Sequence, residues 1–196
     1  QLDAEAKRAG VEFRHEAVTM DGTPVYSLVR NNLPGIKVLG FRGTLTSTAQ
    51  LILEGMRSGK TIDQGIEHAR SLGLAEADPW FDIDGWDSAC KVAALANVLM
   101  DARVTPQQVD RKGIGRLTPE RLAEVEATGK RVVLVSRAKR VDGALRLRVR
   151  AEVLDPDDLL AAVHGSTTGI IFDTDLRLIG QSMLNARLYD QTVDDH

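Results

Sequence analysis

Residues 131–154 read RVVLVSRAKRVDGALRLRVRAEVL, and this stretch carries the clearest indication of the fold. Two runs rich in apolar residues flank residues 141–144, and an Asp-Gly pair between such runs is typical of a tight β-hairpin. Over residues 145–150, leucine and valine alternate with arginine, which is the period-two pattern of a strand with one buried face. The stretch therefore predicts two long antiparallel strands.

The segments on either side of this hairpin mix helical and strand patterns. Apolar residues recur at helical spacing in the middle of the chain, and Thr-x-x-Gln capping boxes begin at Thr61 and Thr105. We expect helices at residues 2–9, 25–33, 44–59, 61–73, 87–101, 118–129 and 155–165, and further strands at residues 11–18, 36–41 and within 168–180. This order predicts an α+β fold with a mixed, largely antiparallel sheet and helices packed on one face.

The composition limits the possible partners. The chain has 196 residues, 43% of them hydrophobic, and a net charge of −3, which fit one main domain and no nucleic-acid partner. Its single cysteine, Cys90, excludes an intrachain disulfide and makes a reducing compartment such as the cytoplasm the expected location. No apolar run approaches the ~20 residues that span a membrane, so we expect no membrane partner.

Common catalytic and nucleotide-binding motifs are missing from the sequence. It contains neither G-x-G-x-x-G nor G-x-x-x-x-G-K-[ST], so it carries no nucleotide fingerprint of its own. It also has no H-E-x-x-H and no G-x-S-x-G, and its four histidines lack the spacing of metal ligands. The chemistry of the chain must therefore be sought in another group of residues.

The stretch LAEADPWFDIDGWDSACK, residues 74–91, concentrates five carboxylates before Lys91. Asp87 and Lys91 are four residues apart, so they share one face of the predicted helix, and Glu76 and Asp82 precede them in a loop. Carboxylates beside a lysine suit a small zwitterion, because the carboxylates bind an ammonium group and the lysine binds an oxygen whose charge changes. The same pattern also fits a solvated loop with a surface ion pair of ~0.3–0.5 kcal/mol.

The stretch and the helix after it, LAEADPWFDIDGWDSACKVAALANVLM, resemble the signature of homoserine dehydrogenases, G-[YF]-x-E-x-D-P-x-x-D-[ILV]-x-G-x-D-x-x-x-K. The segments FRHEAVTMDGTP, VLGFRGTLTSTAQLIL and TTGIIFDTDL are also similar to segments of that family. The resemblance covers about residues 1–180. It implies a substrate-binding, catalytic and dimerisation domain over that range, and a C-terminal tail at residues 181–196 that departs from the family.

The resemblance also implies an activity and a partner domain. Homoserine dehydrogenases interconvert homoserine and aspartate semialdehyde with NAD or NADP, in the cytoplasmic biosynthesis of threonine and methionine. Their nucleotide-binding Rossmann domain precedes the part that this chain resembles, so we expect it upstream of Gln1 and expect residues 1–196 alone to be inactive. A homodimer with a small amino-acid substrate is expected.

The family's functional residues map onto the signature. Lys91 would contact the reacting oxygen and help to move its proton, and Asp87 would orient Lys91 or the substrate. Glu76 and Asp82 would bind the substrate ammonium group. Together these four residues form the predicted catalytic and substrate-binding site.

Two further groups of residues follow from the resemblance. Gly43 and Thr44 would lie at the substrate pocket, near the junction of the domains. A monovalent cation such as Na⁺ would bind loop oxygens that correspond to Glu16, Thr19, Asp21 and Gly22.

Two other readings remain open from the sequence. The chain can be a non-catalytic, dimerising module that binds an amino acid and lacks a nucleotide domain. It can also be part of a related dehydrogenase for another hydroxy or semialdehyde substrate. An upstream Gly-rich strand–turn–helix would distinguish an enzyme from a module.

Overall fold

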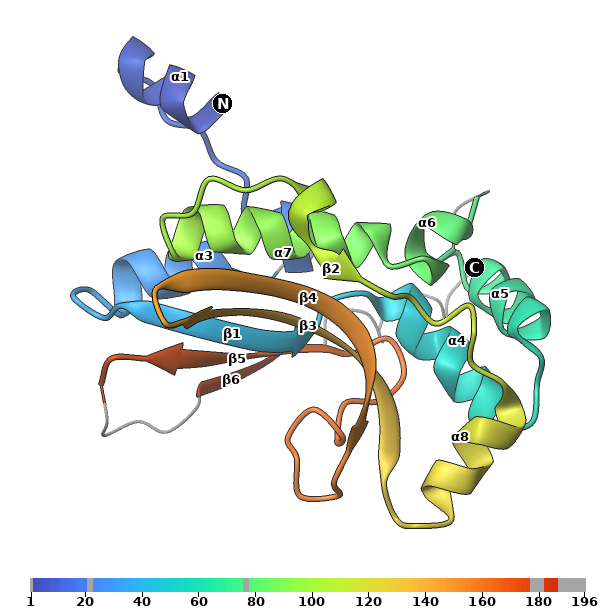
Figure 1. The fold of residues 1–196 in the computed structure, drawn as a ribbon. Helices are drawn as coiled ribbons and strands as arrows, with labels where there is room; N and C mark the ends of the chain where they lie inside the picture. The colour runs from blue at the N-terminus through green and yellow to red at the C-terminus, as the bar shows by residue number, and fades with distance from the viewer. Residues whose placement is uncertain (1, 21–22, 76–77, 177–181, 187–196) are drawn as a thin grey trace.

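The computed structural model describes residues 2–20, 23–75, 78–176 and 182–186. Its centre is a six-stranded sheet in the order β2-β4-β3-β1-β5-β6, in which only the β2–β4 pair is parallel (Figure 1). The strands are β1 Val38–Thr44, β2 Asp110–Arg111, β3 Arg131–Val141, β4 Ala144–Leu154, β5 Thr168–Thr174 and β6 Ser182–Ala186. The predicted mixed, largely antiparallel sheet is thus confirmed.

The helices account for most of the remaining described chain. They are α1 Leu2–Ala9, α2 Ala17–Met20, α3 Val25–Ser27 with the π-helix η1 Leu28–Asn32, α4 Ser47–Arg57, α5 Ile62–Ser71, α6 Trp80–Ile83, α7 Trp86–Leu99, the 3₁₀ turn η2 Pro106–Gln108 and α8 Pro119–Glu126. The predicted capping box of α5 forms, because Thr61 Oγ1 accepts from Gln64 N and Gln64 Oε1 accepts from Thr61 N. No helix within these described parts has both the length and the apolar character to cross a membrane.

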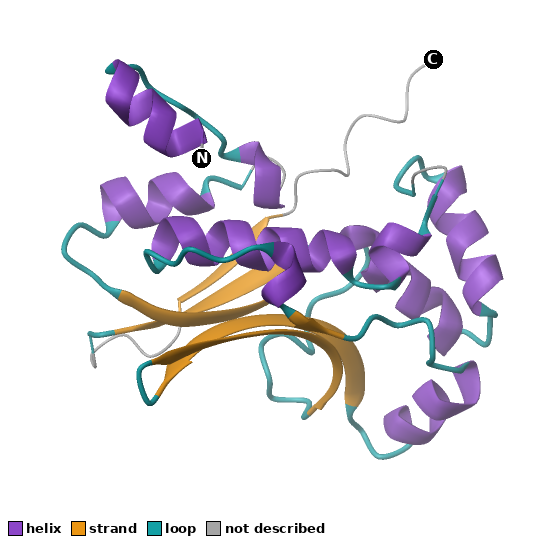
Figure 2. Cartoon of the chain, turned by 45° about the horizontal axis from the view of Figure 1, so that its top comes forward, coloured by secondary structure: helices purple, strands orange, loops and turns teal. Residues whose placement is uncertain are grey.

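Helices cover one face of the sheet. Figures 1 and 2 show α7 and α3 lying across that face, where Val92 and Leu95 of α7 join Leu134 and Val149 of the strands in the main core. The opposite face is covered only in part, by the irregular segment 155–167. Its apolar residues form a smaller cluster with the strands, made of Val133, Val135, Leu154, Leu160, Ala161, Val163 and Ile171.

The β3–β4 hairpin confirms the first sequence prediction. The strands pair in register up to Val141 and Ala144, and the two residues between them, Asp142 and Gly143, have φ of 51° and 80°. Positive φ at both central residues is the conformation of a type I′ turn, which Asp-Gly favours. The predicted alternation in β4 also holds, because Leu147 is buried while Arg148 is exposed.

Two predicted elements are wrong. Residues 11–15 do not form a strand and the chain continues into α2, because Glu16 lies beside α3 and its carboxylate accepts from Tyr26 N (2.5 Å) and Ser27 Oγ (2.6 Å). Residues 155–165 form turns rather than a helix. There the Asp158 carboxylate accepts from Leu160 N (2.9 Å), and Leu160 turns onto the sheet.

The end of the described chain bears on the predicted tail. Residues 182–186, which the sequence assigned to the tail, form β6 and pair with β5 from Thr168–Ala186 to Phe172–Ser182. Residues 177–181 and 187–196 lie outside the described residues. The described part of the tail therefore belongs to the sheet.

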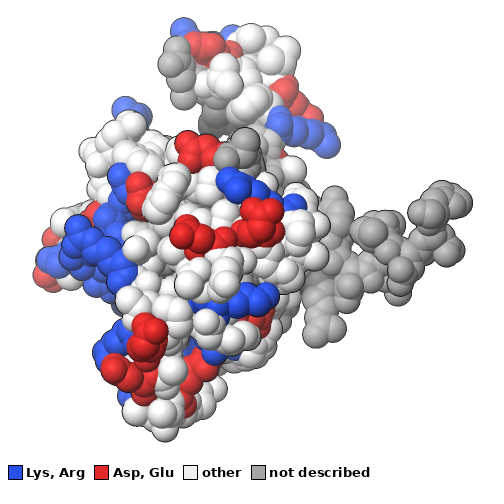
Figure 3. Space-filling view, turned by 90° about the vertical axis from the view of Figure 1, so that its right-hand side faces the viewer, with Lys and Arg blue, Asp and Glu red and all other residues white. Residues whose placement is uncertain are grey.

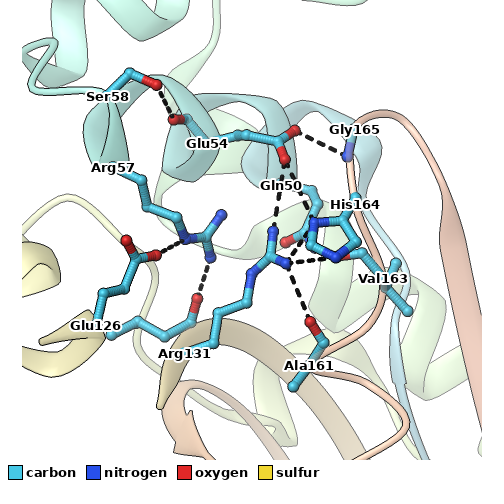
Figure 4. Close-up of polar contacts among 11 residues, drawn as sticks. Gln50, Glu54, Arg57, Ser58, Glu126, Arg131, Ala161, Val163, His164 and Gly165 are labelled. Carbon is cyan, nitrogen blue, oxygen red and sulfur yellow. Dashed lines mark hydrogen bonds and ion pairs between the residues drawn. The ribbon is translucent and has the colours of Figure 1, made fainter. Parts of the chain in front are cut away.

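A group of ion pairs joins α4, α8 and β3 (Figure 4). The Arg57 side chain is 9% exposed, its Nε lies 2.9 Å from Glu126 Oε1, and it donates to the Val132 carbonyl. Burial, and the nearby Arg131, lower the pKa of Arg57 to about 10. The guanidinium is therefore charged at neutral pH, although its surroundings oppose the charge.

Arg131 extends this group to the 155–167 segment. It donates to the Ala161 carbonyl at 3.1 Å and lies 3.5 Å from the Glu54 carboxylate, which accepts from Gly165 N at 2.8 Å (Figure 4). Figure 3 shows acidic and basic side chains close together on this side of the molecule, with a group of Lys and Arg side chains at one edge. The network holds the irregular segment against the sheet.

Candidate functional site

The predicted site begins at the junction of α6 and α7. Gly85 separates the two helices and has φ of 78°, a left-handed conformation that glycine adopts without steric cost. Gly85 takes the N-cap position of α7 and provides no side-chain cap. The tight bend brings α6 directly before the first turn of α7.

Asp87 and Lys91 form the centre of the site. Lys91 Nζ lies 2.9 Å from Asp87 Oδ2 and donates to the Leu45 carbonyl at 2.9 Å. The Lys91 and Asp87 side chains are 18% and 26% exposed, so the pair is partly buried. The predicted shared helix face is confirmed, and the geometry differs from the solvated surface pair that the sequence left open.

Two hydroxyl groups fix this pair to the β1–α4 connection. Thr46 Oγ1 donates to Asp87 Oδ2 at 3.1 Å and lies 2.7 Å from Ser88 Oγ. Both Thr46 and Ser88 are buried. Sequence reasoning missed them, although two buried hydroxyl residues beside apolar helix positions are the kind of polar group that needs a specific partner.

Gly43 and Thr44 lie immediately before Leu45 and join β1 to β5. The Thr44 side chain is buried, and its hydroxyl accepts from Gly169 N at 3.1 Å. A Cβ at Gly43 would lie 2.5 Å from the Gly169 carbonyl oxygen, so only glycine fits there. In this structure the two residues set the strand that presents the Leu45 carbonyl to Lys91, and direct contact with a substrate stays a prediction.

The two remaining carboxylates of the predicted site are only partly placed. Asp82 lies in α6 and is partly exposed, one short turn before α7. Glu76 lies outside the described residues. Their convergence with Lys91 therefore stays a prediction.

Cys90, the residue before Lys91, lacks the lowered pKa that is typical of a reactive thiol. Burial raises the pKa of the Cys90 thiol, and the Asp87 carboxylate raises it further. Because the thiolate is the nucleophilic form, a raised pKa keeps this sulfur unreactive. We therefore expect no nucleophilic role for Cys90.

The loop predicted to bind a cation is described in part. Asp21 and Gly22 lie outside the described residues, and the Glu16 carboxylate is occupied by α3. Within the described parts of the chain, no cluster of three or more His, Cys, Asp or Glu residues is placed to bind a metal. Thr19 and Thr23 are buried, however, and the Thr23 hydroxyl has no hydrogen-bond partner among the residues that the structure describes. An oxygen of this kind fits a hard cation.

Comparison with known proteins supports a single family. The sequence profile described as homoserine dehydrogenase matches residues 24–186. The NAD(+)-dependent homoserine dehydrogenase of Pseudomonas canavaninivorans is 34% identical over 177 residues, which are 90% of this chain and 50% of that protein. The homoserine dehydrogenase of Methanocaldococcus jannaschii is 37% identical over 177 residues, 90% of this chain and 51% of that protein.

A solved structure agrees with the sequence comparison. The crystal structure of a homoserine dehydrogenase from Thiobacillus denitrificans superposes with a TM-score of 0.86 at 29% identity, over 93% of this chain and 42% of that one. The chain spans about half the length of the curated relatives that it matches. From its profile match, fold and signature, the chain belongs to the homoserine dehydrogenase family.

Proposed function

We propose that this chain is the substrate-binding and dimerisation part of an enzyme that interconverts homoserine and aspartate semialdehyde with NAD or NADP. The observation that carries the proposal is the partly buried ion pair of Asp87 and Lys91. Both residues belong to the family signature, and Lys91 also donates to the Leu45 carbonyl. The extent of the domain over residues 1–180, and the cytoplasmic location expected from a single cysteine, belong to the same proposal.

The geometry around Lys91 supports a role in proton transfer. A lysine ammonium has three donors, and Asp87 and the Leu45 carbonyl take two of them. The third is available for the oxygen of the substrate. When aspartate semialdehyde is reduced, Lys91 donates this proton to the oxygen, and in the oxidation of homoserine the amine accepts it. The nicotinamide supplies or takes up the hydride.

The other carboxylates bind the part of the substrate that does not react. Glu76 and Asp82 pair with the substrate ammonium group, which keeps its charge throughout the reaction. Asp87 holds the Lys91 ammonium group in place, and Thr46 and Ser88 hold Asp87. The loop containing Glu16, Thr19, Asp21 and Gly22 would hold a monovalent cation such as Na⁺ through its oxygens, with the Thr23 hydroxyl as an added candidate.

The activity is tested by joining this chain to the nucleotide-binding part of the Pseudomonas canavaninivorans relative. The fusion should reduce NAD⁺ when homoserine is added, and residues 1–196 alone should not. Faster turnover of another hydroxy amino acid would favour a related dehydrogenase. Binding of homoserine by a fusion that never turns it over would favour the non-catalytic module.

A homodimer is part of the proposal, and the face of the sheet opposite the helices is its expected interface. A hollow of about 190 Å³ there is lined by charged side chains that include Arg42, Lys139 and Asp173. Lys139 lies 3.7 Å from Asp173, so Lys139→Glu would place like charges together on this face. We expect light scattering to show a dimer for the wild-type chain, a shift toward monomer for Lys139→Glu, and no shift for Arg121→Glu on α8. A monomeric wild-type chain would contradict the assignment.

A further inference from the structure

The segment of residues 111–115, which begins at the last residue of β2, lies against the α6–α7 turn. Ile114 N donates to the Ile83 carbonyl at 2.9 Å, and Arg111 Nη1 donates to the Asp84 carbonyl at 2.6 Å. Carbonyls at a helix C-terminus lack partners within their own helix. The segment therefore provides the hydrogen bonds that the end of α6 cannot make for itself.

Arg111 also contacts the other side of the Gly85 bend. The centre of its guanidinium group lies 3.6 Å from the centroid of the Trp86 ring, which is the geometry of a cation–π contact. Trp86 is the first residue of α7. The Arg111 side chain thus contacts both sides of the bend. Its guanidinium group donates to the Asp84 carbonyl, at the end of α6, and lies over the Trp86 indole, at the start of α7.

Gly113 allows the segment to come this close. A Cβ at residue 113 would lie 1.7 Å from the Ile83 carbonyl oxygen and 2.7 Å from Asp84 Cα, both backbone atoms. Contacts below 3.0 Å between a Cβ and backbone cannot be relieved by a side-chain rotation. Any other residue at position 113 must push the segment and the α6–α7 turn apart.

The two helices depend on this segment to different degrees. The first turn of α7 has separate anchors, because Asp87 and Ser88 contact Thr46, and Lys91 contacts the Leu45 carbonyl. The four-residue helix α6, which carries Asp82, ends on the carbonyls that Arg111 and Ile114 bind. Loss of these contacts should therefore move Asp82 relative to Lys91 while Lys91 stays in place.

We propose that Arg111 and Gly113 are positioning residues, which set the distance between the Asp82 carboxylate on α6 and the Lys91 ammonium group on α7. The inference rests on the proposed function, in which Asp82 binds the substrate ammonium group. That group carries the same charge before and during the reaction, so a displaced Asp82 weakens ground-state and transition-state binding alike. A positioning role therefore predicts a raised KM for homoserine with little change in kcat.

The kinetic test uses the fused enzyme. Arg111→Met removes the hydrogen bond and the cation–π contact, and we expect it to raise KM about tenfold, which corresponds to about 1.4 kcal/mol, with kcat nearly unchanged. Gly113→Ala should do the same, and Arg111→Lys should recover part of the loss. Arg116→Met changes an exposed arginine of the same loop and is the matched control. A fall in kcat at constant KM would indicate loss of folded enzyme and would overturn the proposal, as would an equal effect of Arg116→Met.

A spectroscopic test on residues 1–196 separates this inference from the proposed activity. Trp80 and Trp86 are the two tryptophans of the chain, so in a Trp80→Phe background the emission reports on Trp86. Arg111→Met should move this emission to longer wavelength and increase its quenching by acrylamide, and Arg116→Met should do neither. Unchanged emission would refute the contact between Arg111 and the turn. A wild-type fusion that does not turn over homoserine would instead refute the proposed activity, and the emission test would still stand.

Discussion

Lys91→Ala should lower kcat of the fused enzyme for homoserine by about 100-fold or more, the scale expected when a positioned acid–base group is removed. The side chain is held at 2.9 Å by both Asp87 and the Leu45 carbonyl, so its remaining proton has a defined direction. Without it, the charge that develops on the substrate oxygen has neither a proton donor nor a cation beside it. Steady-state rates of NAD⁺ reduction measure the effect.

Lys91→Arg separates charge from proton transfer. A guanidinium group keeps its positive charge at neutral pH but does not release a proton, so the pair with Asp87 can form while the transfer step is lost. We expect this variant to remain far below the wild-type rate. Lys60→Ala, between α4 and α5, serves as a lysine control outside the site. A fusion whose turnover is unaffected by Lys91→Ala would remove this lysine from the mechanism.

Arg57→Ala should destabilise the chain by about 2 kcal/mol, because it leaves the Val132 carbonyl and Glu126 without their partner and opens space between α4 and β3. Glu126 is 37% exposed and can be solvated again, which limits the loss. Urea unfolding of residues 1–196, followed by circular dichroism, measures the change in the free energy of unfolding.

The lowered pKa of Arg57 adds a second expectation. Its fall to about 10 means that burial and Arg131 oppose the charge more strongly than Glu126 and Glu54 favour it. Arg57→Met fills much of the same space without a charge, so it should cost less than Arg57→Ala. Arg121→Ala removes an exposed pair with Glu124 and should change stability by less than about 0.5 kcal/mol. A larger loss for Arg57→Met than for Arg57→Ala would contradict this account.

Short-range patterns in the sequence predicted the elements whose conformation depends on neighbouring residues. The Asp-Gly pair predicted the hairpin, the capping box at Thr61 predicted the start of α5, and the spacing of Asp87 and Lys91 predicted their contact. In each case the interacting groups are within a few residues of one another. Turn type, helix capping and i,i+4 contacts are therefore readable from the residue types alone.

The same patterns failed where distant contacts outweigh local preference. The alternation in residues 11–18 predicted a strand, yet that segment lies where Glu16 binds the backbone of α3. Residues 155–165 were predicted to form a helix, yet Leu160 and Val163 instead fill the space beside Val133. In this segment, burial of the apolar side chains against the sheet outweighs the local preference for a helix.

The features of the candidate site also fall into two groups, those that the sequence predicted and those that only the fold created. The sequence already contained the acidic residues, the lysine and their likeness to a family signature. Only the tertiary structure brought the Leu45 carbonyl to Lys91 across 46 residues and Thr46 to Asp87 across 41, and placed Arg111 and Gly113 against the α6–α7 turn. These contacts depend on how the sheet and the helices pack. Packing arises from the whole chain at once, so no local pattern of residues records it.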